Sequence, residues 1–238
     1  VLAEVRLPAL TRWLSRFSVA LAGGTAASGE RPPGEAELPA LPALVGTGGA
    51  LELRYDVWRW SRGLLDAGAG VRFAWPPPPY AGVRVLQELE LAAWLFVRLA
   101  PSLFWEMGPG FGELARVGID VAITPRTLWR TEGAESLKQF GRGLEWAAET
   151  GVQQAFAPGT AAYAAFSLGG ATAQPGGVEL YRAFARLRQE VHQRWIFVEL
   201  EPEVRWPLDP SGGHRPWLGA TVRLEVQLAT VGAPASGP

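Results

Sequence analysis

Charged residues stand at alternate positions in two neighbouring stretches of the chain. Because residues two apart lie on one face of a β-strand, each stretch predicts a strand with one charged face. If a tight hairpin joins the two strands, the basic row faces the acidic row and forms a ladder of cross-strand ion pairs. The same rows could instead line a selective pore. The residues concerned are Arg182, Arg186, Arg188, Glu199, Glu201, Glu203 and Arg205.

Few residues could act as a nucleophile or a general base. The two histidines, His192 and His214, have no Ser or Asp at a spacing that predicts a catalytic pair. Ser102 and Ser167 have no base near them in the sequence. Covalent catalysis needs a nucleophile, a base and an orienting group that meet. We therefore predict no catalytic residues and no enzyme activity.

The composition argues against sites for metals, cofactors and nucleic acids. The chain has no cysteine, so it offers neither thiolate ligands nor disulfides. Its acidic residues alternate with arginines and do not gather as a ligand cluster, so we predict no metal and no cofactor. The formal net charge is −1, with Lys and Arg spread along the chain, which indicates no nucleic-acid partner.

Apolar and polar residues alternate from Ala50 almost to the end of the chain. Strands in soluble proteins usually have about five or six residues, whereas most of these runs have about ten or more, enough to cross a bilayer at a tilt near 45°. The pattern predicts an all-β protein, a transmembrane antiparallel up-and-down β-barrel. The runs are roughly 50–60, 65–75, 80–90, 93–106, 113–124, 126–132, 142–156, 159–171, 178–190, 194–206 and 216–228.

The connections between the runs are alternately tight and long, as in outer-membrane barrels. Bacterial single-chain barrels have an even number of strands, so the eleven runs require one more strand. Either this strand lies within residues 1–48, or one strand is missing from the eleven runs. The sequence therefore predicts about twelve strands.

Tryptophan is abundant, with eleven residues in the chain. On composition alone, a Trp-rich soluble sandwich or carbohydrate-binding module would explain this as well as the aromatic girdles of a membrane barrel do. Trp94 and Trp105 are eleven residues apart, which at a tilt near 40° covers roughly 28 Å, close to the apolar band with its girdles. The predicted membrane-interface aromatics are Trp75, Trp94, Trp105, Trp195, Trp206 and Trp217.

The first 48 residues have a different pattern. Apolar residues in 8–22 recur at intervals of three and four, which predicts a short amphipathic helix. Its apolar face, with Trp13, Leu14 and Phe17, must be buried in the mouth of the barrel, on the membrane surface or against a partner protein. We favour the mouth of the barrel, where the segment would act as a plug. The predicted organisation is an N-terminal helix and Pro/Gly-rich segment at 1–48, a transmembrane barrel at 49–229 and a C-terminal tail at 230–238.

Three segments carry a resemblance to known proteins: Gly110-Phe111-Gly112-Glu113, Gly143-Leu144-Glu145-Trp146 and residues 195–207. Through them, the chain resembles a family of uncharacterised proteobacterial outer-membrane proteins, mainly over residues 80–228. The resemblance implies a barrel with an N-terminal amphipathic segment in the bacterial outer membrane. It implies no catalytic residue.

These observations favour an integral outer-membrane β-barrel of a Gram-negative bacterium that acts as a structural or anchoring subunit of an envelope complex. Because a small barrel leaves little room between its interior side chains, we expect ion pairs to fill most of the lumen. The alternatives are a small, porin-like diffusion channel and, less favoured, an outer-membrane enzyme. The expected partners are outer-membrane lipids, lipopolysaccharide and other envelope proteins.

Overall fold

The structure is a computed structural model that describes residues 2–6, 17–22, 50–72, 75–141, 143–173, 177–192 and 196–226. All regular elements of the described residues are β-strands. None of the described segments forms a helix long and apolar enough to span a membrane. The strands are β1 (Leu2–Arg6), β2 (Phe17–Ala22), β3 (Ala50–Trp60), β4 (Gly63–Arg72), β5 (Pro79–Ala92), β6 (Leu95–Leu99), β7 (Ser102–Glu106), β8 (Gly110–Thr124), β9 (Thr127–Lys138), β10 (Leu144–Ala157), β11 (Thr160–Ala171), β12 (Leu180–His192), β13 (Ile196–Pro207) and β14 (Trp217–Val226).

The strands form one antiparallel sheet in which chain neighbours pair with each other from β1 to β14, except that β6 and β7 do not pair with each other. Strands β6 and β7 are two parts of one crossing, since both pair with β5 and with β8. Ala100 and Pro101 separate them. The hydrogen bonds continue across this break, because the Ala100 N–H donates to Arg116 O at 2.9 Å and the Val85 N–H donates to Pro101 O at 3.0 Å.

The fold class is confirmed: the protein is an all-β, antiparallel, up-and-down barrel. The twelve strand segments from β3 to β14 correspond to the eleven alternating runs, because β6 and β7 share the run at 93–106. Strand pairing also occurs within residues 1–48, where β2 pairs with β3 and β1 pairs with β2. One boundary was wrong: residues 132–138, expected in a long connection, continue strand β9.

The predicted helix at 8–22 does not extend over its last six residues. Phe17–Ala22 form β2 and pair with Ala50–Tyr55 of β3. The physical reason is that β3 would otherwise present a row of unpaired backbone groups, which a neighbouring extended segment can satisfy. Trp13 and Leu14 lie outside the described residues. The proposed plug face therefore stays a prediction, with Phe17 now on a strand.

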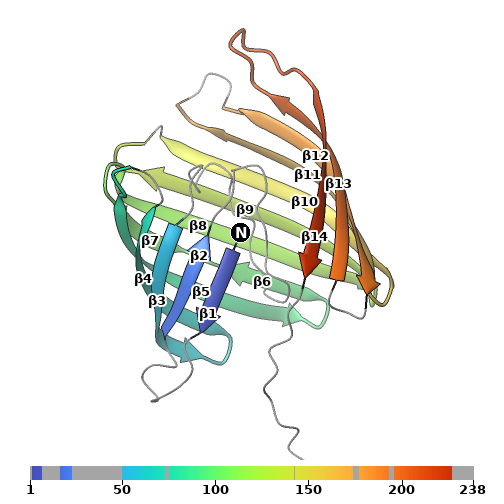
Figure 1. Cartoon of the computed structure of the whole chain (residues 1–238), viewed down its shortest axis with the longest axis horizontal. Helices are drawn as coiled ribbons and strands as arrows, with labels where there is room; N and C mark the ends of the chain where they lie inside the picture. Colours follow the sequence, from blue (N-terminus) through green and yellow to red (C-terminus); the bar gives the residue numbers. More distant parts are fainter. Residues whose placement is uncertain are drawn as a thin grey trace, which may run out of the picture.

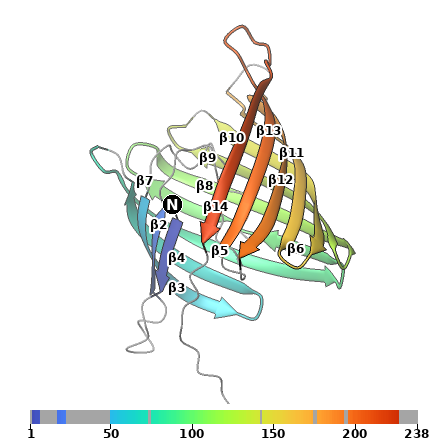
Figure 2. The same cartoon turned by 45° about the vertical axis from the view of Figure 1, so that its right-hand side comes forward.

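The sheet curls so that β14 comes to the same side of the molecule as β1 and β2 in both views (Figure 1; Figure 2). Large apolar side chains are exposed on its outer face, among them Leu53, Val83 and Leu224. The most buried side chains are mainly charged: Asp66, Arg98, Glu106, Asp120, Glu132, Glu201 and Glu203. An apolar exterior around a polar interior is the arrangement of a membrane barrel.

Candidate functional site

The clearest cluster on the interior wall joins arginines of β12 to glutamates of β13. Arg182 Nε lies 2.6 Å from Glu203 Oε2, and Arg182 Nη2 lies 2.7 Å from Glu201 Oε1. Arg186 Nη2 lies 2.6 Å from Glu201 Oε2. Within β13, Arg205 Nη2 lies 2.7 Å from Glu203 Oε1. The structure thus brings these predicted residues together, and we call them, with Glu199 and Arg223, the arginine–glutamate ladder.

Glu201 is the centre of the ladder. Its side chain is 2 % exposed and lies beside the guanidinium groups of Arg182, Arg186 and Arg223. Arg223 of β14 also contacts Glu199. Sequence reasoning left Arg223 out because the acidic row was matched only with the preceding strand. In the sheet, β13 lies between β12 and β14, so its carboxylates receive arginines from both sides.

Arg188 differs from the other predicted arginines of the ladder. It pairs in register with Glu199, but its guanidinium lies over the ring of Phe197, 4.3 Å from the ring centre. Arg182 likewise lies 4.2 Å from the centre of the Phe184 ring. Cations over aromatic faces are held by the electrostatic field of the ring. Aromatic rings therefore help to hold these arginines in place on the wall.

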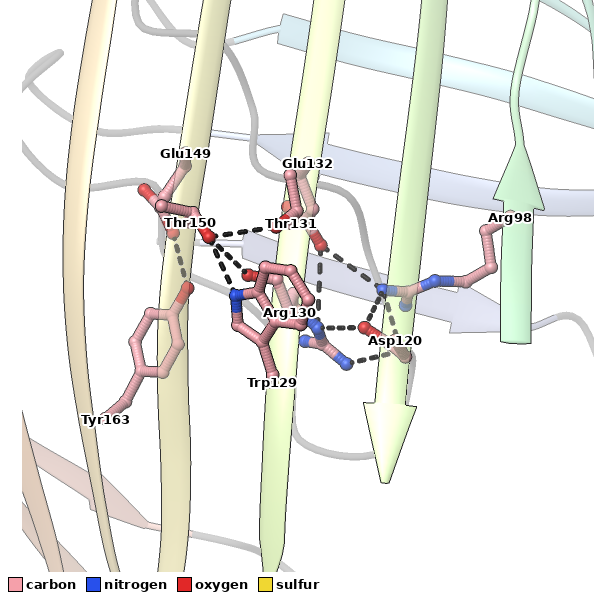
Figure 3. Close-up of polar contacts among 9 residues, drawn as sticks. All are labelled: Arg98, Asp120, Trp129, Arg130, Thr131, Glu132, Glu149, Thr150 and Tyr163. Carbon is pink, nitrogen blue, oxygen red and sulfur yellow. Dashed lines mark hydrogen bonds and ion pairs between the residues drawn. The ribbon is translucent and has the colours of Figure 1, made fainter. Parts of the chain in front are cut away.

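A second interior cluster joins three other strands (Figure 3). Arg98 of β6 reaches Asp120 of β8 at 3.1 Å and Glu132 of β9 at 3.3 Å. Arg130 Nε lies 2.7 Å from the other carboxylate oxygen of Asp120, Oδ1. Two arginines and two carboxylates thus form a balanced group, the Arg98 cluster. Its members come from three runs, with Arg98 34 residues from Glu132, so the register of the strands was needed to find it.

Tyr163 extends the polar wall between the two clusters. Its hydroxyl donates to Glu149 Oε1 at 2.9 Å (Figure 3), and its ring packs edge-to-face on Phe184 with ring centres 5.8 Å apart. The ring lies over Gly151, where an added Cβ would come within 2.8 Å of Tyr163 Cε2. The same Cβ would come within 2.6 Å of the Ala164 carbonyl, so a residue larger than glycine at 151 would press on the backbone of β11 as well as on the ring that contacts Glu149.

Ion pairs also cover the remaining interior wall. Arg84 Nη2 lies 2.8 Å from Asp66 Oδ2, and Arg72 Nη2 donates to Glu106 Oε2 at 3.1 Å. The Arg84 side chain is 34 % exposed, and those of Arg72 and Arg205 are 25 % and 26 % exposed. Their partners Asp66 and Glu106 are less than a tenth exposed. The carboxylates are thus covered by the wall, while water reaches the outer parts of the guanidinium groups.

The predicted interface aromatics differ in their exposure and do not all lie on the same face of the sheet. Trp75, which precedes β5, Trp94 in the turn before β6, and Trp105 in β7 are 94 %, 55 % and 39 % exposed. Trp217 pairs in register with Arg205, whose guanidinium lies 5.5 Å from its ring centre. Directly paired residues point to the same face of a sheet, so Trp217 stands on the interior face with Arg205.

The two remaining predicted interface aromatics are Trp206 and Trp195. Trp206 is half-buried on β13, two residues beyond Val204, and so shares the outer face of that strand. Trp195 lies outside the described residues.

The connection between β13 and β14 is a compact polar loop outside the spanning strands. Asp209 accepts hydrogen bonds from the hydroxyl of Ser211 and from the N–H groups of Gly213 and Ser211, and it pairs with Arg215 at 2.9 Å. The Ser211 hydroxyl and the Gly213 N–H hold the pKa of Asp209 below its usual range. The nearby His214 ring contacts Trp206 O and Tyr181.

No group of three or more His, Asp or Glu side chains that could hold a metal ion occurs in the part of the chain that the structure describes. His214 is held in its loop by a backbone carbonyl and an aromatic ring. The charges on the interior wall can act electrostatically on solutes in the lumen.

Comparisons with known proteins bear on the fold. No protein-family model matches the chain, and a search of curated proteins finds no significant match. Among solved structures, the chain is similar to the NanC porin, with a TM-score of 0.50, 8 % identity, and coverage of 76 % of this chain and 94 % of that one. It is also similar to the KdgM porin, including its complex with disordered oligogalacturonate, with a TM-score of 0.45, 9–10 % identity, and coverage of 73 % and 91 %.

The likeness to NanC shows the fold alone, a β-barrel of the kind that this porin has. The β-barrel predicted from the sequence is thereby confirmed.

Proposed function

We propose that the protein is a porin-like channel through which small hydrophilic solutes diffuse across the outer membrane. The observation that carries this proposal is the exposure of the interior arginines, led by Arg84 at 34 %. Had ion pairs filled the lumen, these guanidinium groups would be covered on every side. A lumen that water enters is the minimum requirement for a diffusion channel.

The size of the barrel supports the same proposal. A barrel of eight strands is just wide enough for side chains to fill, whereas the wider porins of 16–18 strands hold an aqueous channel. Because β6 and β7 share one crossing, the strands from β3 to β14 make eleven crossings, and β1 and β2 add to them, which gives this barrel an intermediate width. Its interior charges also favour water over a dry core, because desolvating paired ions costs free energy that their attraction rarely repays in full.

The anchoring role favoured from the sequence rested on a filled lumen, and the exposed guanidinium groups argue against that premise. We therefore prefer the channel, which was the alternative. We also propose that the chain comes from the family of proteobacterial outer-membrane proteins that it resembles. Two of the shared segments support this by their place in the fold, since Gly110-Phe111-Gly112-Glu113 begins β8 and residues 196–207 form β13.

The proposal predicts steady conductance steps when the purified protein is inserted into planar lipid bilayers in KCl. It also predicts swelling of proteoliposomes in isotonic solutions of small uncharged sugars, because water-filled pores pass them down their gradient. Protein unfolded by boiling is the matched control. A folded, inserted barrel that gives neither conductance nor swelling would show that the lumen is closed. The anchoring role would then be the preferred function.

A further inference from the structure

The outer wall of the barrel is hollowed by a groove of about 720 Å³ that crosses strands β9 to β14. Such a volume lies within the range of small binding sites, about 300–1,000 Å³. The groove opens outward, since Phe166 and Leu218 at its edge are 40 % and 76 % exposed. Small side chains form the middle of its lining, among them Ala164, Ala183 and Ala185, and larger apolar side chains such as Trp129 and Val152 complete it.

On β3, β5, β7 and β8 the outer face carries large exposed side chains, and Trp129, Val152 and Leu218 are exposed on the groove wall as well. What sets the groove apart is the row of small side chains between these three, formed by Ala164, Ala183 and Ala185. Large aliphatic groups suit contact with lipid chains, whereas small residues in membrane proteins gather where two protein surfaces approach closely. The large exposed side chains are Leu51, Leu53, Val83, Leu103, Val117 and Ile119.

Pro202 removes a hydrogen bond from the floor of the groove. Leu208 N–H donates to Glu179 O at 2.7 Å, and in an antiparallel pair such bonded positions recur at every second residue. The register is the same on both sides of Pro202, so Ala185 and Pro202 lie opposite each other at a position where two hydrogen bonds are expected. The paired residues nevertheless stop at Phe184–Glu203 and resume at Leu187–Leu200. Proline has no N–H. The Ala185 carbonyl therefore receives no bond from residue 202 in a wall where membrane lipid offers no donor.

A hydrogen-bond donor lies on the same wall, two strands away. The hydroxyls of Thr131 and Thr150 are 2.9 Å apart, and Trp129 Nε1 donates to Thr150 Oγ1 at 2.9 Å. The contact between the two hydroxyls uses one of their two protons. When Thr131 donates in this contact, the Thr150 proton points to the Arg130 carbonyl at the long distance of 3.5 Å; when Thr150 donates, the Thr131 proton is the one left over. Figure 3 shows this group on β9 and β10.

From this geometry, we propose that the groove wall is the interface between two copies of this chain in the membrane. The wall is self-complementary about a two-fold axis near β11: the threonine pair of one copy faces the Ala185 carbonyl of the other, and the reverse. Phe166 and Leu218 of each copy then pack into the groove of the other copy. The proposal concerns the outer wall and is independent of conductance through the lumen.

Because the chain has no cysteine, single cysteines can test the interface directly. Ala164→Cys places a thiol in the groove near the proposed axis, and Val83→Cys places one on the opposite, large-residue wall. In proteoliposomes under mild oxidation, we expect Ala164→Cys to form disulfide-linked dimers at least about tenfold more than Val83→Cys, because a bound pair raises the effective thiol concentration. Equal cross-linking at the two positions would mean random collision and would overturn the proposal.

A second pair of variants measures assembly without any cross-link. Ala164→Trp fills the groove and should convert the dimer to a monomer in native mass spectrometry of the detergent-extracted protein, whereas Val83→Trp should leave the dimer intact. Heat-dependent gel mobility shows in each case that the barrel is folded. If the unmodified protein is a monomer, or if Ala164→Trp remains a dimer, the wall is not the interface. A monomer retaining phospholipid would instead assign the groove to an acyl chain.

Discussion

Replacing Glu201 by Gln is expected to destabilise the barrel and to make the channel more selective for anions. Glu201 is 2 % exposed and is surrounded by the guanidinium groups of Arg182, Arg186 and Arg223. Removing one partner of a buried ion pair costs about 3–5 kcal/mol. We expect the lower end of this range, because these arginines are 16–23 % exposed and water can partly replace the lost carboxylate.

Two measurements check this prediction. Denaturant unfolding in detergent gives the change in stability, and the reversal potential in a KCl gradient gives the change in ion selectivity, which should move toward chloride. Glu135→Gln is the matched control, since Glu135 is an exposed carboxylate of β9 outside both interior clusters. An unchanged reversal potential in Glu201→Gln would mean that ions do not pass the arginine–glutamate ladder.

Replacing Val222 by Arg should cost about 2–4 kcal/mol, because a guanidinium group near the middle of the lipid-facing surface loses its water. Val222 is 70 % exposed on the outer face of β14. Val198→Arg, on the same face of β13, should behave alike. Thr221→Arg should cost much less, since Thr221 pairs in register with Glu201 and the new guanidinium enters the polar interior.

The unfolding free energies of these three variants test which residues face lipid and which face the lumen. A similar cost at Val222 and Thr221 would contradict the assignment of one residue to lipid and the other to the lumen. A negligible cost at both Val198 and Val222 would mean that this face of the barrel does not meet the hydrocarbon.

Much of the fold could be predicted from the sequence because a membrane barrel repeats one rule. Each strand has one face toward lipid and one toward the lumen, so the alternation of apolar and polar residues, together with the length of the run, identifies it. The helix predicted at 8–22 was wrong over Phe17–Ala22. The spacing of apolar residues within a segment cannot reveal the unpaired edge of β3, with which those residues pair. The abundance and spacing of the tryptophans likewise do not say which face of the sheet a ring occupies, and Trp217 stands on the interior face beside Arg205.

The candidate site was predictable only where a single hairpin forms it. Arg182 and Glu201 lie on consecutive runs, so their pairing followed from the chain itself. Arg98 and Glu132 lie on strands that are not chain neighbours, with β8 between them, and their contact depends on the register of three strands. Whether the lumen is filled could not be predicted either, because it depends on the width of the closed barrel and the reach of each side chain.

The most direct test of a water-filled lumen compares two adjacent cysteines in β14. The natural chain has none, so Thr221→Cys and Val222→Cys each carry a single thiol. In proteoliposomes, a charged thiol reagent that cannot cross lipid should modify Thr221→Cys rapidly and reduce its conductance, while Val222→Cys stays protected by the bilayer. An unreactive Thr221→Cys, or modification of both thiols at one rate, would contradict the account of an aqueous interior bounded by this strand.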